Sequence, residues 1–188
     1  MVTPQPTLET NIFKMEHEPE KELSVPTLHP LSDKWAMWAH LPHDTDWAIN
    51  SYKKIITMNT VENAIATTET IPEVLVKNCM LFLMRDGIKP IWEDPKNRSG
   101  GCFSYKIANK NVHEVWRDIS YVLVGGTISP VQSFVTNVNG ITISPKKNFC
   151  IIKIWMANCD NQNPNIVNPD IKGLSSTGCL FKKHTPEY

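Results

Sequence analysis

The feature that most constrains the fold is a pair of β-type segments in the last third of the chain, at residues 138–144 and 149–156. Both segments are rich in β-branched residues, and only the four residues 145–148 separate them. A connection this short joins neighbouring antiparallel strands, because a parallel pair needs a crossover of about a dozen residues or more. The chain is therefore predicted to contain an antiparallel sheet.

Further strands and two helices are predicted from periodicity. The clearest helix is Asn111–Val124, where apolar residues recur every three or four positions and Gly125 follows as a terminator. A shorter helix begins at Thr60 and runs to Thr68. The other strands are predicted at residues 34–41, 51–58, 80–84 and 102–108. Hairpin-linked strands with helices between them predict an α+β domain, with a mostly antiparallel sheet and helices on one face.

A single folded domain spanning residues 28–188 is expected from the length of 188 residues. The preceding residues 1–27 are rich in Pro, Glu and Thr and show no sustained period, so they are predicted to form a flexible tail. The alternative for this tail is a partner-binding arm that uses Leu8, Ile12 and Phe13.

The chemistry of the chain argues against several classes of protein. No apolar run approaches the roughly 18 residues needed to span a bilayer, so no membrane partner is expected. The five cysteines form no Cys-x-x-Cys pair, which argues against a disulfide framework and a zinc site. No nucleophile has a recognisable paired base, so no enzymatic activity is expected. A cytoplasmic monomer without metal or other cofactor is the expectation, with the nucleus as the alternative location.

Tryptophans in polar loops point to a ligand. Of the six tryptophans, Trp47 lies beside an aspartate ahead of a strand, Trp92 lies in a long loop, and Trp155 lies near the end of the last clear strand. Residues after Gly126 hold six lysines and three acidic residues, so the positive charge gathers there. Aromatic faces stack on bases, and the carboxylate of Glu93 can accept two adjacent N–H bonds from guanine. These features predict a nucleotide with an anionic tail as the ligand.

An ordered set of short motifs carries a resemblance to a known family. The set contains His29-Pro30-Leu31, Trp35, Trp38, Trp47, Thr60-Val61-Glu62, the run from Gly87 to Asp94, Gly100-Gly101, Trp116 and Ile154-Trp155. In order and spacing, over about residues 28–159, it resembles the eukaryotic translation initiation factor 4E family, which binds the 7-methylguanosine cap of messenger RNA. The resemblance implies a curved antiparallel sheet with helices on its convex face and a cap slot on its concave side.

The resemblance also implies roles for four residues of the base slot. Trp47 and Trp92 would sandwich the methylated base, Glu93 would accept from N1 and N2, and Trp155 would pack on the methyl group. Methylation at N7 makes the base cationic, so stacking on each tryptophan gains roughly 0.5 to 2 kcal/mol from the cation–π interaction. Capped messenger RNA is therefore the expected ligand, with a role in translation initiation.

The expected phosphate contacts depart from the family pattern. Cys102 occupies a position that is basic in the family, and Ile151 occupies a second one. The predicted phosphate-binding residues are Lys146, which matches a basic position of the family, and its neighbours Lys147 and Lys153. The weaker candidates nearer the C-terminus are Ser175, Ser176, Lys182 and Lys183.

The partner-binding face implied by the resemblance is altered as well. Ile65 stands where the family has tryptophan, and Arg117 stands where it has leucine. The predicted partner-binding residues, which would receive a helix of a scaffold protein, are His29, Pro30, Val61, Ile65, Arg117 and Tyr121. Residues 161–170 are rich in Asn and Pro where the family has a helix, and no helix is expected there.

Two alternatives to an initiation factor stay open from the sequence. The altered partner face favours a cap-binding competitor or translational repressor that does not recruit the usual scaffold protein. The missing charge at Cys102 favours a general single-stranded RNA binder. A polar loop with His40, His43, Asp44 and Asp46 holds metal-ligand types, but a solvated loop explains these residues, and no metal is expected.

Overall fold

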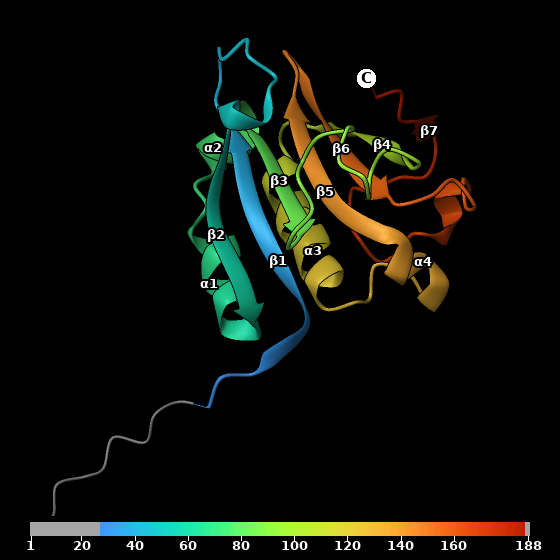
Figure 1. Cartoon of the computed structure of the whole chain (residues 1–188), viewed down its shortest axis with the longest axis horizontal. Helices are drawn as coiled ribbons and strands as arrows, with labels where there is room; N and C mark the ends of the chain where they lie inside the picture. Colours follow the sequence, from blue (N-terminus) through green and yellow to red (C-terminus); the bar gives the residue numbers. More distant parts are fainter. Residues whose placement is uncertain (1–26, 187–188) are drawn as a thin grey trace, which may run out of the picture.

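The computed structural model describes residues 27–186, and a seven-stranded curved sheet forms its centre (Figure 1). The strand order is β2-β1-β3-β5-β6-β4-β7, and every adjacent pair is antiparallel. The strands are β1 (Pro30–His40), β2 (Tyr52–Thr60), β3 (Met80–Arg85), β4 (Gly101–Ala108), β5 (Val138–Pro145), β6 (Phe149–Met156) and β7 (Leu180–Lys183). The predicted antiparallel α+β fold is confirmed.

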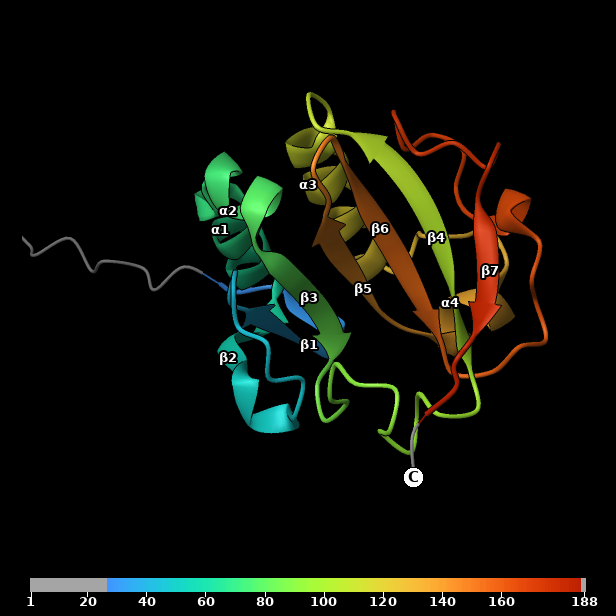
Figure 2. The same cartoon turned by 90° about the horizontal axis from the view of Figure 1, so that it is seen from above.

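The three helices α1 (Val61–Thr70), α2 (Glu73–Asn78) and α3 (Val112–Val124) lie on one side of the sheet (Figure 2). A fourth helix, α4 (Gln132–Asn137), immediately precedes β5. Thr60 caps α1, since its side chain accepts a hydrogen bond from the amide of Asn63. Both predicted helices are present. Sequence periodicity missed α2, α4 and β7, because elements of six, six and four residues are too short to show a period.

Alternation along the strands gives the sheet two apolar faces of unequal size. On the helix side, Trp35, Met37 and Leu83 join Trp116 of α3 in the main core. The opposite side carries a smaller cluster of Phe82, Met84, Ile88 and Trp155, with Trp38, Tyr52, Met80 and Trp92 packed against it. The smaller cluster forms the apolar floor of the face that the helices leave uncovered.

Two further expectations from the sequence concern chain segments next to these elements. The strand predicted at residues 34–41 is present as β1, but it begins earlier and ends at His40, so Leu41 lies beyond it and is 49% exposed. The expectation of no helix at residues 161–170 is confirmed, apart from a single 3-10 turn at Pro164–Ile166. The predicted tail at residues 1–27 falls almost wholly outside the described residues.

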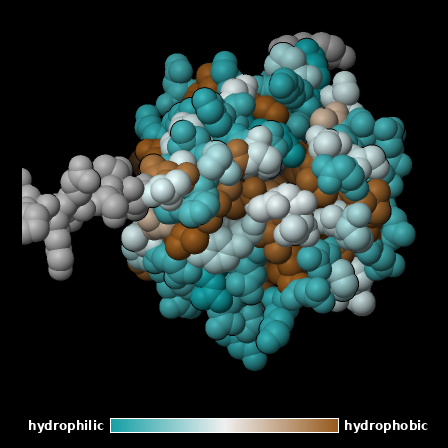
Figure 3. All heavy atoms as spheres, turned by 90° about the horizontal axis from the view of Figure 1, so that it is seen from below, coloured by the Kyte–Doolittle hydropathy of each residue, from teal (hydrophilic) through white to brown (hydrophobic). Residues whose placement is uncertain are grey.

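The surface is mixed in character. Seen from below, hydrophobic residues reach the surface in several patches across the middle of the molecule, between hydrophilic margins (Figure 3). None of the helices in the described part of the chain is long and apolar enough to cross a membrane.

Candidate functional site

A cavity of about 560 Å³ opens over the smaller apolar cluster, on the face that the helices leave free. It brings together six residues that the sequence singled out, from loops and strands up to 108 positions apart: Trp47, Trp92, Glu93, Lys146, Lys153 and Trp155. The remaining lining comes from Tyr52, Met80, Phe82, Pro90, Ile91, Ser144 and Thr185. Indole rings, one carboxylate and two ammonium groups therefore share one concave site, which we call the slot.

Trp47 enters the slot from the loop between β1 and β2. Its ring stacks on the imidazole of His40, with centroids 4.2 Å apart and planes 2° apart, and remains 56% exposed. His40 is buried, and its Nε2 donates to the Asp46 carbonyl over 2.7 Å. Asp44 and Asp46 each accept a hydrogen bond from a backbone amide two residues further on, which tightens the loop. Trp47 therefore has one face supported by protein and one face open.

Trp92 and Glu93 belong to the loop between β3 and β4, which buried polar side chains pin in place. Asp94 accepts from the backbone amides of Lys89 and Lys96, both over 2.9 Å. Asn97, fully buried, donates to the carbonyls of Lys89 and Ile91, also over 2.9 Å. The loop is therefore held by side-chain bonds in place of regular secondary structure.

A second asparagine, from β5, completes this network. The side-chain amide of Asn139 donates to the Lys96 carbonyl over 2.7 Å and to the side-chain oxygen of Asn97 over 2.9 Å. Sequence reasoning missed Asp94, Asn97 and Asn139 as supports of the site. Asp94 bonds only within its own loop, and nothing in the sequence indicates that Asn139 contacts residues 42 and 43 positions away.

Trp155 forms part of the slot's floor. It is 4% exposed, and its Nε1 donates to the hydroxyl of Thr142 on the neighbouring strand over 2.7 Å. Its ring meets that of Phe82 edge to face. Because both the donor and the ring are engaged, Trp155 presents a fixed apolar surface to whatever enters the slot.

Glu93 sets the electrostatics of the slot. Its carboxylate is exposed at the rim and lines the cavity beside Tyr52. Burial raises the pKa of Tyr52 to about 12, and the negative charge of Glu93 acts in the same direction. Tyr52 is therefore a neutral hydroxyl at physiological pH, and Glu93 is the one acidic side chain in the described lining of the slot.

Lysine side chains line the slot or lie beside it. Lys153 lies two residues before Trp155 on β6, so both side chains point to the same face of the sheet. Lys182 of β7 lies opposite Cys102 of β4, and its Nζ lies 5.9 Å from the centroid of the Trp92 ring. Lys182 therefore places a positive charge beside Cys102, which is itself uncharged. Lys147, one of the predicted phosphate contacts, is exposed in the β5–β6 turn and does not line the cavity.

His184 is a further residue that sequence reasoning missed. Its ring stacks on Trp92, with centroids 5.6 Å apart and planes 15° apart, and approaches Trp155 at 4.9 Å. It is buried, and its Nδ1 donates to the carbonyl of Asn97 over 2.7 Å. No pattern could have indicated it, because it follows the short strand β7 that periodicity does not reveal.

A separate apolar groove of about 370 Å³ lies on the helix side. Its lining includes three of the predicted partner-binding residues, Val61, Ile65 and Tyr121, and four that were not predicted: Leu31, Ala64, Val124 and Gly125. Ile65 is 47% exposed. We call this site the helix-side groove.

The other three predicted partner-binding residues flank this groove. Arg117 lies one turn before Tyr121 on α3 and pairs with Asp118 at 3.2 Å, outside the lining. The Nδ1 of His29 lies 2.6 Å from Glu62, and this hydrogen bond lowers the pKa of Glu62 to about 2. Pro30 begins β1 opposite Thr60.

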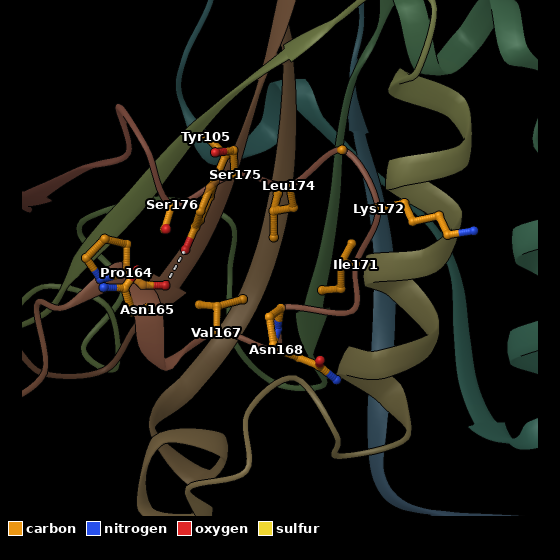
Figure 4. Close-up of a pocket in the computed structure, with 12 residues that line it drawn as sticks. Tyr105, Pro164, Asn165, Val167, Asn168, Ile171, Lys172, Leu174, Ser175 and Ser176 are labelled. Carbon is orange, nitrogen blue, oxygen red and sulfur yellow. Dashed lines mark hydrogen bonds between the residues drawn. The ribbon is translucent and has the colours of Figure 1, made fainter.

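A third cavity, of about 460 Å³, is lined by Tyr105 of β4 and by residues of the segment 164–176 (Figure 4). The hydroxyl of Tyr105 points to the carbonyl of Pro164, with 3.4 Å between the oxygens, and burial raises the Tyr105 pKa. Lys172 extends away from the other lining residues, past α3. No charged side chain is directed into this cavity in the view of Figure 4, so it offers no constellation for binding or chemistry comparable with the slot.

The donor set of the slot suits a flat ring with attached anionic groups. Within residues 27–186, no group of three or more His, Cys, Asp or Glu side chains could hold a metal ion. Two indoles on separate loops can take a ring between them, one carboxylate can accept from the ring's edge, and lysines can neutralise an attached anion. The fold and the slot thus define a binding protein for such a ligand.

The comparisons with known proteins identify the family. A family model described as "Eukaryotic initiation factor 4E" matches residues 30–183, and the chain belongs to this family. The chain is 30% identical over 142 residues to eukaryotic translation initiation factor 4E-2 of Schizosaccharomyces pombe, a match that covers 72% of this chain and 56% of that protein. It is 26% identical to factor 4E-1 of the same organism, over 86% of this chain and 80% of the relative.

Solved structures share the fold. The schistosome eIF4E complexed with m7GpppG and 4E-BP is similar with a TM-score of 0.65 and 21% identity, over 72% of this chain and 76% of that one. The Ascaris suum eIF4E-3 complex with m7G cap is similar with a TM-score of 0.63 and 20% identity, over 74% and 78%. At these identities the likeness establishes the fold.

Proposed function

We propose that this protein binds the 7-methylguanosine cap of messenger RNA in translation initiation. The base stacks between Trp47 and Trp92, Glu93 accepts from N1 and N2 of guanine, and Trp155 contacts the methyl group. Lys146 and Lys153, which line the slot, hold the phosphates, and Lys182 and Lys147 add positive charge from outside the lining. Action in the cytoplasm follows from this role.

The observation that carries the proposal is the meeting of three tryptophans and one glutamate in one cavity. Membership of the family and the related complexes supply the ligand class, since those complexes contain m7GpppG and an m7G cap. In this chain, Trp47, Trp92, Glu93 and Trp155 all line the same slot. A slot with only tryptophans would stack any base, whereas Glu93 matches the two donors of guanine.

The experiment is calorimetric titration of a methylated GTP analogue into the Glu93→Gln variant. The amide presents a donor where guanine offers donors, so binding should weaken by roughly 2 to 4 kcal/mol. Glu114→Gln, which removes an exposed carboxylate of α3 on the helix side, is the matched control and should leave affinity unchanged. Equal loss in both variants, or none in Glu93→Gln, would remove Glu93 from the role of guanine reader.

A partner helix is proposed for the helix-side groove. Two related complexes contain a 4E-binding protein. The groove is lined by apolar residues, as helix-in-groove recognition requires. Ile65 in place of an indole, and the charge of Arg117 beside it, favour weak binding of a standard scaffold helix. This difference supports the second candidate function, a cap-binding competitor that holds the cap without recruiting the usual scaffold.

A further inference from the structure

His184 occupies a position that the cap-binding scheme above does not use. It follows β7 directly, and its backbone amide donates to the carbonyl of Gly100 over 2.9 Å. The Nδ1 atom donates to Asn97 in the same loop. Two hydrogen bonds thus attach the end of the last strand to the loop that carries Trp92 and Glu93.

The ring of His184 lies behind Trp92 as seen from the slot. The two rings are stacked. Trp92 lines the slot, and so does Thr185, the residue after His184, but His184 itself does not. His184 is 7% exposed and also touches Trp155. One imidazole therefore contacts two of the three tryptophans of the slot without lining the slot itself.

The hydrogen bond fixes the protonation of the neutral ring. A carbonyl only accepts, so Nδ1 carries the proton and Nε2 carries the lone pair. Within residues 27–186, the buried Nε2 has no hydrogen-bond partner. A second proton would therefore need a buried acceptor that the described surroundings do not provide.

From this geometry we infer that His184 is a positioning residue, which holds Trp92 in the orientation for stacking on the cap base and weakens the stack when its imidazole is protonated. This inference rests on the proposed cap-binding function. An imidazolium on one face of Trp92 and a cationic methylated base on the other would polarise the same π system in opposite directions. Lys182, near the Trp92 ring, already adds a positive charge there.

Several charged groups act on the titration of His184. Burial lowers the pKa of His184 below its usual value; the bond to Asn97 opposes this shift, the Lys153 ammonium adds to it, and the Glu93 carboxylate opposes it. Glu93 acts from the loop and Lys153 from β6. Lys182 of β7 lies near the Trp92 ring on which His184 stacks. The lowered pKa keeps the ring neutral at physiological pH, and protonation begins only in the acid range.

The test uses three full-length proteins and the dinucleotide cap m7GpppG, which has no terminal phosphate monoester to titrate in the range measured. Wild type, His184→Phe and His184→Ala are titrated by tryptophan fluorescence between pH 5.0 and 7.0. At pH 7.0, His184→Ala should bind about three to ten times more weakly, because Trp92 loses its stacked partner, and His184→Phe should recover much of that loss.

The pH profile separates positioning from simple packing. Wild type should lose about threefold in affinity, relative to His184→Phe, as the pH falls through the titration of His184. Glu93 and the lysines are common to both proteins, so their effects cancel in this ratio. Superimposable profiles, or full affinity in His184→Ala, would overturn the inference. If wild type does not prefer m7GpppG to unmethylated GpppG at pH 7.0, the cap-binding proposal itself fails, which is a distinct result.

Discussion

The slot and the helix-side groove are built on opposite faces of the same sheet from different kinds of contact. The slot is formed by two loops whose tryptophans stack on histidines and whose backbone is pinned by buried asparagine and aspartate side chains. The groove is formed by β1, α1 and α3 and is lined by apolar residues, with one tyrosine. The slot is therefore pre-organised for one ligand chemistry by polar contacts, whereas the groove offers an apolar surface without such polar contacts.

The largest effect is expected from a variant that removes the buried side-chain bonds of the loop that carries Trp92. In Asn97→Ala, the carbonyls of Lys89 and Ile91 and the side chain of Asn139 all lose a buried partner. Asn139 keeps its bond to the Lys96 carbonyl, but the two loop carbonyls lose their donor at a cost of about 1 to 3 kcal/mol each. Cap affinity should therefore fall about a hundredfold by calorimetry.

The groove should not respond to the same change. Peptide binding at the helix side should be unaltered in Asn97→Ala, because the lining of the groove comes from β1, α1, α3 and Gly125 and includes no residue of the loop. Asn148→Ala, in the exposed β5–β6 turn, is the control and should leave cap binding intact. A matching loss of peptide binding in Asn97→Ala would indicate general unfolding and would contradict the separation of the two sites.

The reverse test changes the groove and spares the slot. Ile65→Trp combined with Arg117→Leu restores an indole wall and removes a charge, so a scaffold-type helical peptide carrying tyrosine and leucines should bind about thirtyfold more tightly. Cap affinity should stay the same. Calorimetry with the peptide measures the first effect and cap titration the second.

The control for this gain is Ile55→Trp, which exposes a tryptophan on β2, away from the groove. It should leave peptide affinity unchanged. Sub-micromolar binding of the peptide to the unmodified protein would show that Ile65 and Arg117 do not weaken the face, and the competitor hypothesis would lose its support.

The two sites also differ in how well the sequence predicts them. Trp47, Trp92 and Glu93 were found because tryptophans and a carboxylate in polar loops have no core role to explain them. The sequence alone does not show which face of the sheet the Lys153 side chain occupies, because a register shift of one residue moves every side chain to the other face. The slot's ligand-facing residues were thus predictable, while its supporting residues were not.

Supports such as Asn97, Asn139 and His184 escape prediction because their partners lie 42 to 87 positions away. The lining of the groove could not be predicted for a different reason. Its surface is set by the packing of α1 against α3, so residues as plain as Ala64 and Val124 line it. Arg117 shares a helix face with Tyr121, yet its side chain pairs with Asp118, which no periodicity indicates.

The smallest expected effect concerns Lys182, whose charge lies beside Cys102, the position that is basic in the family. Lys182→Ala should weaken binding of a cap triphosphate about fivefold, since a solvated lysine–phosphate contact contributes about 1 kcal/mol. Lys183→Ala is the matched control, because alternation along β7 directs its side chain to the other face. Affinity measured in low and high salt should converge for wild type and Lys182→Ala as screening increases. Equal losses in the two variants would remove Lys182 from the phosphate site.

Recognition of a cationic methylated guanine by the slot can be tested by comparing the affinities of a methylated and an unmethylated nucleotide. Tryptophan fluorescence quenching compares 7-methyl-GTP with plain GTP on the unmodified protein under identical conditions. The methylated ligand should bind at least about tenfold more tightly, because cation–π stacking on Trp47 and Trp92 and a charge-assisted bond to Glu93 need supply only about 1.4 kcal/mol together. Equal affinities for the two nucleotides would contradict the account.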